Sequence, residues 1–388
     1  MSKIIIKMEI ISRFILKKDD SFLLLGPHGV GKTTLIKQMY PQAYWIDLMD
    51  PENYRLFTAH PEHLKEIIAG NSDLTKIVID EIQKIPALLP VVQTLLAEKK
   101  NLKFILIASS IRKLQKKGLD VLAGRITLKH LYPFSVQELG SLFSLEKALK
   151  TGLIPIIWQD ENPTEKLNAY FSFYLQKEIE QAGLTHQVGN FARFLEAVSF
   201  FQAKVLNLSD IARDYHLERK TVERYVRILE DFFLCFQLPV FSKKSTRNLV
   251  TKNKFYLVDI GLYRTLRPAG ILDYPEEIET KALESLIAQS LKAWAAYQQN
   301  KYQLYFWKTY HGVEVDLVLY GPDLFWVIVI KNSANISLKD FRGLKSFSKD
   351  YPQSKPFLLY RGKQTFKKYG VTCLPVERFL GEIGNLKN

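Results

Sequence analysis

The stretch SFLLLGPHGVGKTTLIKQM, residues 21–39, places a glycine-rich loop between a short apolar run and a helical pattern. Phe22 to Leu25 predict a buried strand, and the following residues fit the pattern G-x-x-x-x-G-K-[ST]. Backbone N–H groups can wrap a phosphate only where glycine leaves room, and the helix N-terminus adds a partial positive charge. We therefore expect a nucleotide phosphate to lie against Gly26, Pro27, His28, Gly29, Val30, Gly31, Lys32, Thr33 and Thr34. Lys32 would reach the β- and γ-phosphates, and the Thr33 hydroxyl would bind magnesium.

A second apolar run ends in two carboxylates. In KIVIDEIQKIP, residues 76–86, the strand predicted over Ile77–Ile79 leads into Asp80 and Glu81. Downstream of a phosphate loop, Asp80 is expected in the magnesium shell, and Glu81 is expected to polarise the attacking water. Together the two stretches predict a site for ATP and Mg²⁺.

Three further residues are candidates for this site. LKFILIASS, residues 102–110, ends on Ser109 and Ser110, and either serine could sense the γ-phosphate or simply cap the helix that follows. In LAGRITLKHLYPFS, residues 122–135, Arg125 precedes another strand. It could stabilise developing charge as an arginine finger, in its own chain or a neighbouring one. An ordinary surface arginine is the competing interpretation.

Strands near 22–25, 43–48, 76–80, 103–108 and 126–131 alternate with helices, which predicts an α/β fold with a parallel sheet covered on both faces. GPHGVGKTTL, VIDEIQKIP, ASSIRKL and LAGRITLKHLYPFSVQEL resemble a family of prokaryotic AAA-type ATPases that carry a C-terminal domain of unknown function. The resemblance extends over nearly the whole chain. It implies a sensor role for Ser109 and Ser110 and a functional role for Arg125.

The composition is that of a soluble globular protein: 47% of the 388 residues are hydrophobic and 24% are charged. There is no apolar run long enough to predict a transmembrane helix, and two distant cysteines, Cys235 and Cys373, give neither a disulfide framework nor a zinc cluster. We expect a cytoplasmic protein without membrane contact. The net charge is +14, and it is densest in residues 201–270, where 13 Lys and Arg face 7 Asp and Glu. Such a block favours polyanions, although a solvated basic face is the commoner explanation.

Residues 136–200 have helical periodicity and resemble the helical lid of the same ATPases, although a plain helical connector would have this pattern too. Residues 207–234, NLSDIARDYHLERKTVERYVRILEDFFL, have helix-turn-helix spacing, with Ser209 as the expected N-cap. His216 occupies the turn position where glycine is common, and histidine tolerates left-handed geometry better than most residues.

The outer face of the second of these helices is basic, through Arg219, Lys220 and Arg224. The loop that follows carries Lys243, Lys244 and Arg247 and predicts the wing of a winged helix. We expect the helix in the major groove of duplex DNA and the loop on phosphates. A winged helix that only packs between domains is the alternative, mildly favoured by Glu218 and Glu223.

Residues 271–388 predict a long helix, a strand meander, a helix near 338–349 and strands at 356–360 and 371–376. This order is similar to the core of PD-(D/E)xK nucleases, where two acids and a lysine serve a bound metal. The resemblance maps Glu284, Asp316 and Lys331 onto that site, but Val329 stands where a metal-binding glutamate is needed. Glu314 could substitute, since it shares a strand face with Asp316. We expect a degenerate nuclease-like site, with Lys331 on a phosphate or at the surface.

The sequence thus predicts a P-loop ATPase core at 1–135, a helical lid at 136–200, a winged helix at 201–270 and a restriction-endonuclease-like α/β domain at 271–388. The leading hypothesis is an ATPase that couples its nucleotide state to DNA binding, with homo-oligomerisation allowed. A nucleotide-switched module for a protein partner and a metal-dependent nuclease are the alternatives.

Overall fold

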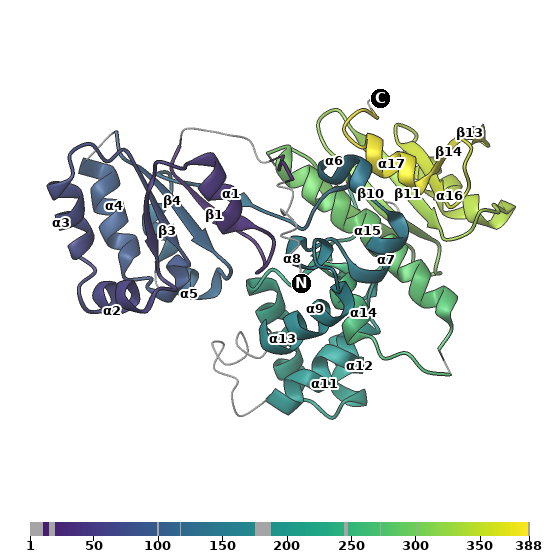
Figure 1. The fold of residues 1–388 in the computed structure, drawn as a ribbon. Helices are drawn as coiled ribbons and strands as arrows, with labels where there is room; N and C mark the ends of the chain where they lie inside the picture. The colour runs from purple at the N-terminus through teal and green to yellow at the C-terminus, as the bar shows by residue number, and fades with distance from the viewer. Residues whose placement is uncertain are drawn as a thin grey trace, which may run out of the picture. The chain divides into compact units, whose positions relative to one another are not determined.

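A computed structural model describes residues 11–14, 20–98, 101–116, 118–174, 188–243, 247–271, 273–299 and 301–386 (Figure 1). The chain divides into two compact units. The parallel-sheet unit comprises Ile15–Tyr132 and Arg227–Leu234, and the mixed-sheet unit comprises Met1–Phe14, Pro133–Val226 and Cys235–Asn388. The five-stranded sheet belongs to the first unit, and the six-stranded and three-stranded sheets belong to the second.

The parallel-sheet unit has a five-stranded sheet in the order β2-β3-β4-β1-β5, and all neighbouring strands are parallel. The strands are β1 Phe22–Leu25, β2 Tyr44–Asp47, β3 Lys76–Asp80, β4 Lys103–Ala108 and β5 Thr127–His130. The five predicted strands and their parallel pairing are confirmed. The central strands β1, β3 and β4 are apolar runs without polar alternation, because both of their faces are buried.

Helices cover both faces of this sheet. They are α1 Lys32–Met39, α2 Pro51–Ala59, α3 His63–Gly70, α4 Leu88–Glu98 and α5 Arg112–Lys116, with the 3-10 turns η1 Ile82–Lys84 and η2 Leu119–Leu122. Alternate residues of β1 serve different cores: Phe22 and Leu24 pack in the cluster that contains Ile36 of α1, and Leu23 packs in the cluster that contains Leu89 of α4. The predicted two-sided covering is confirmed.

The mixed-sheet unit begins with short helices and continues into a small antiparallel sheet. The helical elements are α6 Val136–Leu139, η3 Gly140–Leu142, α7 Leu145–Thr151, α8 Pro155–Trp158, α9 Pro163–Ala169, the π-helical η4 Tyr170–Tyr174, α11 Val188–Ser199, α12 Leu208–Asp214 and α13 Arg219–Asp231. The last residues of α13, from Arg227, belong to the parallel-sheet unit. β6 Lys204–Val205, β7 Cys235–Leu238 and β8 Lys254–Leu257 form the three-stranded sheet in the order β6-β8-β7.

The predicted helix pair is present as α12 and α13. His216 lies in the turn between them with φ 52°, so the predicted left-handed geometry is confirmed. The predicted N-cap is wrong: Asn207, not Ser209, precedes α12, and its side chain accepts a hydrogen bond from the Ser209 backbone N–H. Both residues are good caps by type, so only the backbone conformation could distinguish them.

The C-terminal part of the mixed-sheet unit is a six-stranded mixed sheet in the order β13-β14-β12-β11-β10-β9 (Figure 1). Its strands are β9 Gln303–Lys308, β10 Glu314–Tyr320, β11 Phe325–Lys331, β12 Lys355–Tyr360, β13 Phe366–Lys368 and β14 Val371–Pro375. Helices α14 Ile260–Leu266, α15 Pro275–Tyr297, α16 Arg342–Asp350 and α17 Val376–Glu382 and the turn η6 Leu338–Phe341 complete it. The predicted strand and helix order is confirmed; β13, a short exposed strand, escaped prediction.

Candidate functional site

The glycine-rich loop leaves β1 at the carboxyl edge of the parallel sheet. A Cβ on Gly26 would lie 2.3 Å from the Leu131 carbonyl oxygen, so only glycine fits where the loop begins. Gly29 and Gly31 have φ of 76° and 86°, the left-handed region that glycine adopts without strain. Val30 anchors the loop in the apolar cluster around α1. This backbone turns directly into the N-terminus of α1, which is the arrangement that favours an anion.

Lys32 is the first residue of α1 and is only 5% exposed. Its Nζ donates hydrogen bonds to the carbonyl oxygens of Gly26 (2.8 Å) and Pro27 (3.0 Å). The ammonium therefore lies within the loop, where phosphate oxygens can replace the carbonyl partners. His28 and Thr34, by contrast, are exposed.

Thr33 and Asp80 meet across the two motifs. The Thr33 hydroxyl donates a 2.7 Å hydrogen bond to Oδ2 of Asp80, which ends β3. Burial raises the pKa of Asp80 to about 6, with smaller raising effects from Glu81 and Asp47, while the Thr33 hydrogen bond opposes the shift. A hydroxyl and a buried carboxylate facing each other beside a phosphate loop are ligands that suit Mg²⁺, so the residues present fit the predicted ion.

Glu81 is held in an unusual position. Its φ of 57° is left-handed, which costs about 1–3 kcal/mol for a residue with a side chain and is concentrated at functional sites. The Ser109 hydroxyl donates a 2.8 Å hydrogen bond to Oε2 of Glu81. Gln83 Nε2 donates to both Glu81 and Ser109. Gln83 is a residue that sequence reasoning missed, although it lies two positions after Glu81 in the motif.

The two serines at the end of β4 have different partners. Ser109 contacts Glu81, whereas the Ser110 hydroxyl accepts a 3.4 Å hydrogen bond from the backbone N–H of Arg112, the first residue of α5. Ser109 therefore contacts the candidate catalytic carboxylate, whereas Ser110 contacts the start of a helix. The sequence had left both interpretations open for each serine.

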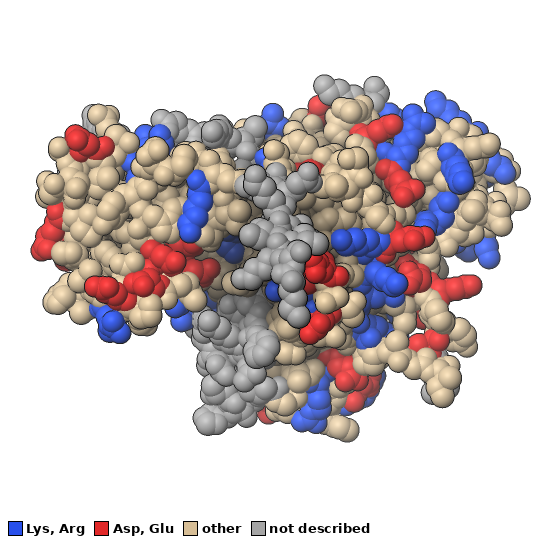
Figure 2. Space-filling model, in the orientation of Figure 1, with Lys and Arg blue, Asp and Glu red and all other residues tan. Residues whose placement is uncertain are grey.

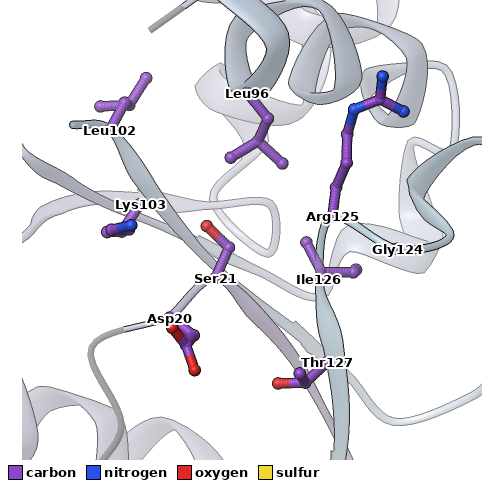
Figure 3. Close-up of a pocket in the computed structure, with 9 residues that line it drawn as sticks. All are labelled: Asp20, Ser21, Leu96, Leu102, Lys103, Gly124, Arg125, Ile126 and Thr127. Atoms are coloured by element: carbon purple, nitrogen blue, oxygen red, sulfur yellow. The ribbon is translucent and has the colours of Figure 1, made fainter. Parts of the chain in front are cut away.

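Arg125 does not lie with the other candidates. It precedes β5, and Thr127 at the start of β5 pairs with Phe22 at the start of β1, so Arg125 is at the amino edge of the sheet. Four residues of β1 separate this edge from the glycine-rich loop, a length of about 13 Å. Arg125 lines a pocket of about 450 Å³, and Figure 3 shows its side chain extending away from Ser21 and Thr127. A role at the phosphate loop of its own chain does not fit this geometry.

The basic residues of α13 are exposed. Arg219, Lys220 and Arg224 all lie on the solvent-facing side of the helix, while Val222 and Val226 are buried, as the periodicity predicts. These three side chains therefore form an accessible cationic face.

The loop between β7 and β8 differs from a free wing. It lies against the edge of the six-stranded sheet: Phe241 N–H donates to the Phe306 carbonyl oxygen at 2.7 Å, and Val250 N–H donates to that of Lys308 at 3.1 Å. Arg247 forms a 2.6 Å ion pair with Asp350. The Arg247 guanidinium is therefore already engaged with α16, and its expected contact with phosphates stays a prediction.

Two other loop residues have separate outcomes. Lys243 is exposed, with its Nζ 4.2 Å from the ring centroid of Tyr320. Lys244 lies outside the described residues. A further basic surface escaped prediction: in Figure 2 basic side chains gather over the region where Figure 1 labels β13, β14 and α16, and Lys363, Lys367 and Lys368 there are exposed.

Glu284 and Asp316 are brought together in the mixed-sheet unit, but around a residue that was not predicted. The Nζ of Lys254, from β8, lies 2.6 Å from Glu284 Oε1, 2.7 Å from Glu314 Oε1 and 3.9 Å from Asp316 Oδ1. Glu314, the candidate substitute ligand, is therefore part of this group. We call these four residues the Lys254 cluster.

Lys331 does not join the Lys254 cluster. Its Nζ forms a 2.9 Å ion pair with Asp340 of η6. Val329, two residues earlier and so on the same strand face, packs with Phe341 and Leu344 at the start of α16. The predicted grouping of Lys331 with Glu284 and Asp316 is wrong. The Asp340 carboxylate offsets the charge of Lys331, which is why this buried strand can end on a lysine.

The electrostatics of the Lys254 cluster are dominated by burial and by its cations. Burial would lower the pKa of Lys254, but the surrounding acids hold it well above its usual range. Burial acts to raise the pKa of Glu314, yet Lys254 and Lys308 bring it to about 2. Burial and the Glu284 charge raise the pKa of Asp316 to about 7. Among the described residues no group of three or more His, Cys, Asp and Glu side chains is placed to hold a metal ion, and in the Lys254 cluster the ammonium lies where the carboxylates converge.

Lys254 escaped prediction because it closely follows the basic loop that is expected to form the wing. The available signal was its place at the head of KFYL, an otherwise apolar strand. A lysine in a strand that is buried throughout requires acidic partners, and these come from far along the chain.

Three family models match consecutive parts of the chain. Residues 18–140 match an AAA domain, residues 142–273 match a domain of unknown function (DUF8612) and residues 279–379 match another (DUF4143). The first match supports an AAA-type, nucleotide-binding first part of the chain. The other two describe no activity.

Two relatives and one solved structure are similar to this chain. Uncharacterized protein Mb2031c of Mycobacterium bovis and uncharacterized protein Rv2008c of Mycobacterium tuberculosis are each 24% identical over 367 residues, covering 92% of this chain and 80% of theirs. A structure of the replication initiator DnaA bound to AMPPCP and single-stranded DNA is 14% identical with a TM-score of 0.27, covering 54% of this chain and 82% of that one. Within the part of the chain that is described, no helix is both long and apolar enough to span a membrane.

Proposed function

We propose that this chain binds ATP with Mg²⁺ and hydrolyses it at the carboxyl edge of the parallel sheet. The observation that carries the proposal is the meeting of Thr33 with Asp80 beside the glycine-rich loop. Lys32 would bind the β- and γ-phosphates, and Thr33 and Asp80 would hold the ion. When bound, Mg²⁺ would neutralise negative charge on the phosphates.

Glu81 would accept a proton from the attacking water and orient it toward the γ-phosphate. Ser109 and Gln83 contact Glu81 and would fix its carboxylate. Oε1 of Gln83 is buried without a hydrogen-bond partner among the described residues, and a water molecule could satisfy it.

Nucleotide binding is tested with Lys32→Ala in the full-length chain. Titration with a fluorescent ATP analogue should show saturable binding in the wild type and a loss of about 10- to 100-fold or more in affinity in the variant, since a charged contact to phosphate is removed. Phosphate release should be lost as well. ATP turnover that survives in Lys32→Ala would contradict the assignment.

We further propose that residues 201–270 act as a winged helix whose α13 contacts duplex DNA, and that nucleotide state and DNA binding are coupled. The exposed cationic face of α13 supports this. The measurement is the ATPase rate with and without duplex DNA at two salt concentrations. Stimulation should fade at high salt, because phosphate contacts release counterions.

A protein partner in place of DNA is the second candidate, and one observation favours it. The loop expected to be a wing is bonded to the six-stranded sheet, and Arg247 is paired with Asp350, so fewer cations remain for phosphates. ATP turnover that is indifferent to duplex DNA at low salt would support this candidate over the first.

Arg125 is proposed to complete the site of a neighbouring copy of the chain. Its position at the amino edge supports action between subunits of a homo-oligomer, where it would stabilise charge developing on the neighbour's phosphates. We also propose that the chain divides into four domains: an ATPase core at 1–135, a lid at 136–200, a winged helix at 201–270 and a nuclease-like domain at 271–388.

A further inference from the structure

The Lys254 cluster contains a fully buried ammonium at the point where three carboxylates converge. Lys254 is 0% exposed, and Glu284 is 3% exposed. The ammonium comes from the small antiparallel sheet, Glu284 comes from α15, and Glu314 and Asp316 come from β10. Elements distant in the sequence thus meet at one cation.

Each carboxylate in the cluster is already engaged by donors of the chain. Glu284 Oε1 accepts from the Tyr256 hydroxyl at 2.8 Å, and its Oε2 accepts from Lys281 at 3.2 Å. Glu314 Oε2 accepts from Lys308 at 2.8 Å, and Asp316 Oδ2 accepts from the Ile330 backbone N–H at 2.7 Å. Lys254, whose ammonium has three N–H groups to offer, faces the same Oε1 of Glu284 together with Oε1 of Glu314 and Oδ1 of Asp316.

Charge balance leaves no surplus for a divalent ion. Glu284, Glu314 and Asp316 contribute at most three negative charges, and Lys254, Lys281 and Lys308 contribute three positive ones. Hard divalent cations need carboxylate charge that is not already neutralised, and they need oxygens at about 2.0–2.6 Å. The Lys254 ammonium lies within hydrogen-bonding distance of Glu284 and Glu314 and 3.9 Å from Asp316, and it offsets their charge without either requirement.

We propose that the Lys254 ammonium takes the place of the divalent cation of the nuclease-like site, and that Glu284, Glu314 and Asp316 form a latent divalent-cation site that opens only when this ammonium is removed. Because the ammonium belongs to the chain itself, its ion pairs hold β8 against β10 and α15 at all times. A metal ion would do so only when bound. The inference does not depend on ATP binding, because every residue in it belongs to the mixed-sheet unit.

The test compares Mn²⁺ binding, by electron paramagnetic resonance, in the nucleotide-free full-length wild type and Lys254→Ala. The wild type should show no saturable binding at the cluster. Lys254→Ala should gain one Mn²⁺ site with an affinity at least about tenfold higher than any wild-type binding. Adding Asp316→Asn to Lys254→Ala should remove the new site.

Lys308→Ala is the matched control. It removes one lysine charge from the same Glu314 but leaves the central ammonium in place. It should gain no Mn²⁺ site. A gain equal to that of Lys254→Ala would overturn the proposal, because overall charge rather than the position of Lys254 would then govern metal binding.

Lys254→Ala leaves three buried carboxylates without their central partner and could therefore unfold. In that event the variant is refolded with and without Mn²⁺, and recovery of the native tryptophan fluorescence only with Mn²⁺ supports the proposal. A folded Lys254→Ala that binds no Mn²⁺ overturns it. If the variant folds under neither condition, Mn²⁺ binding is compared between the wild type and the single variant Asp316→Asn. A wild-type Mn²⁺ site that Asp316→Asn abolishes overturns the proposal, and the absence of such a site supports it.

Discussion

The Ser109 hydroxyl donates a 2.8 Å hydrogen bond to the carboxylate of Glu81, joining the end of β4 to the end of β3 at the carboxyl edge of the parallel sheet. Glu81 has left-handed backbone geometry at this point. A strained residue held by a neighbouring side chain is a common feature of catalytic sites. The pair therefore gives the proposed ATPase its most specific geometric feature.

The two serines at this edge should differ in effect. Ser109→Ala removes a hydrogen bond to a carboxylate, typically about 1.5–3 kcal/mol, so kcat for ATP should fall roughly tenfold or more with little change in nucleotide affinity. Ser110→Ala, the matched control, should leave kcat nearly unchanged, because the hydrogen bond of its hydroxyl within the described part of the chain is to the start of α5. Steady-state phosphate release measures both. Equal losses in the two variants would contradict the separate roles.

Arg125→Ala should lower ATP turnover by about 10³-fold if its guanidinium serves the phosphates of a neighbouring copy. Mixing Arg125→Ala with Lys32→Ala should then restore part of the activity, because the wild-type arginine of one chain can complete the intact loop of the other. Phosphate release from the mixture is the measurement. Full activity of Arg125→Ala alone would remove this residue from the mechanism.

The cationic face of α13 should govern any DNA binding. Replacing Arg219, Lys220 and Arg224 together with alanine should weaken duplex binding and lower the slope of log affinity against log salt by about three, one for each lost phosphate contact. Fluorescence anisotropy at several salt concentrations measures the slope. An unchanged slope would mean that DNA, if bound, lies elsewhere.

Arg247→Ala provides the contrast from the same basic block. Because Arg247 is paired with Asp350 and also donates to Ser346, its loss should cost stability, about 1 kcal/mol, and leave DNA affinity unchanged. Urea unfolding and anisotropy on the same preparation distinguish the two effects. A selective loss of DNA affinity at unchanged stability would contradict this structural role.

Asp259 should make folding stability depend on pH. Its carboxylate accepts hydrogen bonds from the Leu153 and Gly261 backbone N–H groups, and burial raises its pKa from 3.8 to about 6. The folded state therefore holds a proton that the unfolded state releases between these values. This stabilising contribution is full below pH 3.8 and is lost as the pH rises toward 6, about 3 kcal/mol in all.

Asp259→Asn should remove this contribution. Between pH 4 and 6 the stability of the variant minus that of the wild type should rise with pH by up to about 1.4 kcal/mol per pH unit, since the other carboxylates are common to both proteins. Urea unfolding followed by tryptophan fluorescence suits the measurement, because four of the five tryptophans belong to the mixed-sheet unit. Parallel stability curves would contradict the raised pKa.

Local patterns predicted much of the fold and of the nucleotide site. The loop at Gly26–Thr33 and the strand ending at Asp80 are contiguous motifs, and parallel strands bring their carboxyl ends to one edge, so their meeting follows from fold class alone. The left-handed backbone of His216 was also predictable, because it depends on the tight turn between two neighbouring helices and not on distant segments. Residue type and spacing were sufficient in these cases.

Contacts between distant segments were not predictable. Lys254 meets Glu284 and Glu314 only because the small sheet packs against α15 and β10, and nothing near Lys254 in the sequence indicates this. Arg247 likewise pairs with an acid more than one hundred residues away, Asp350. A basic loop predicts phosphate contacts by default, and only tertiary structure shows which of its cations are already engaged.

The most direct test of the central claim is ATP hydrolysis by Glu81→Gln, measured beside nucleotide binding in the same preparation. The amide keeps the size of the side chain and its contact with Ser109 but cannot accept a proton from water. We predict ATP affinity within about threefold of the wild type and a loss of about 10²- to 10⁴-fold in turnover. Turnover at the wild-type rate in Glu81→Gln would contradict the assignment of this edge of the sheet as the catalytic site.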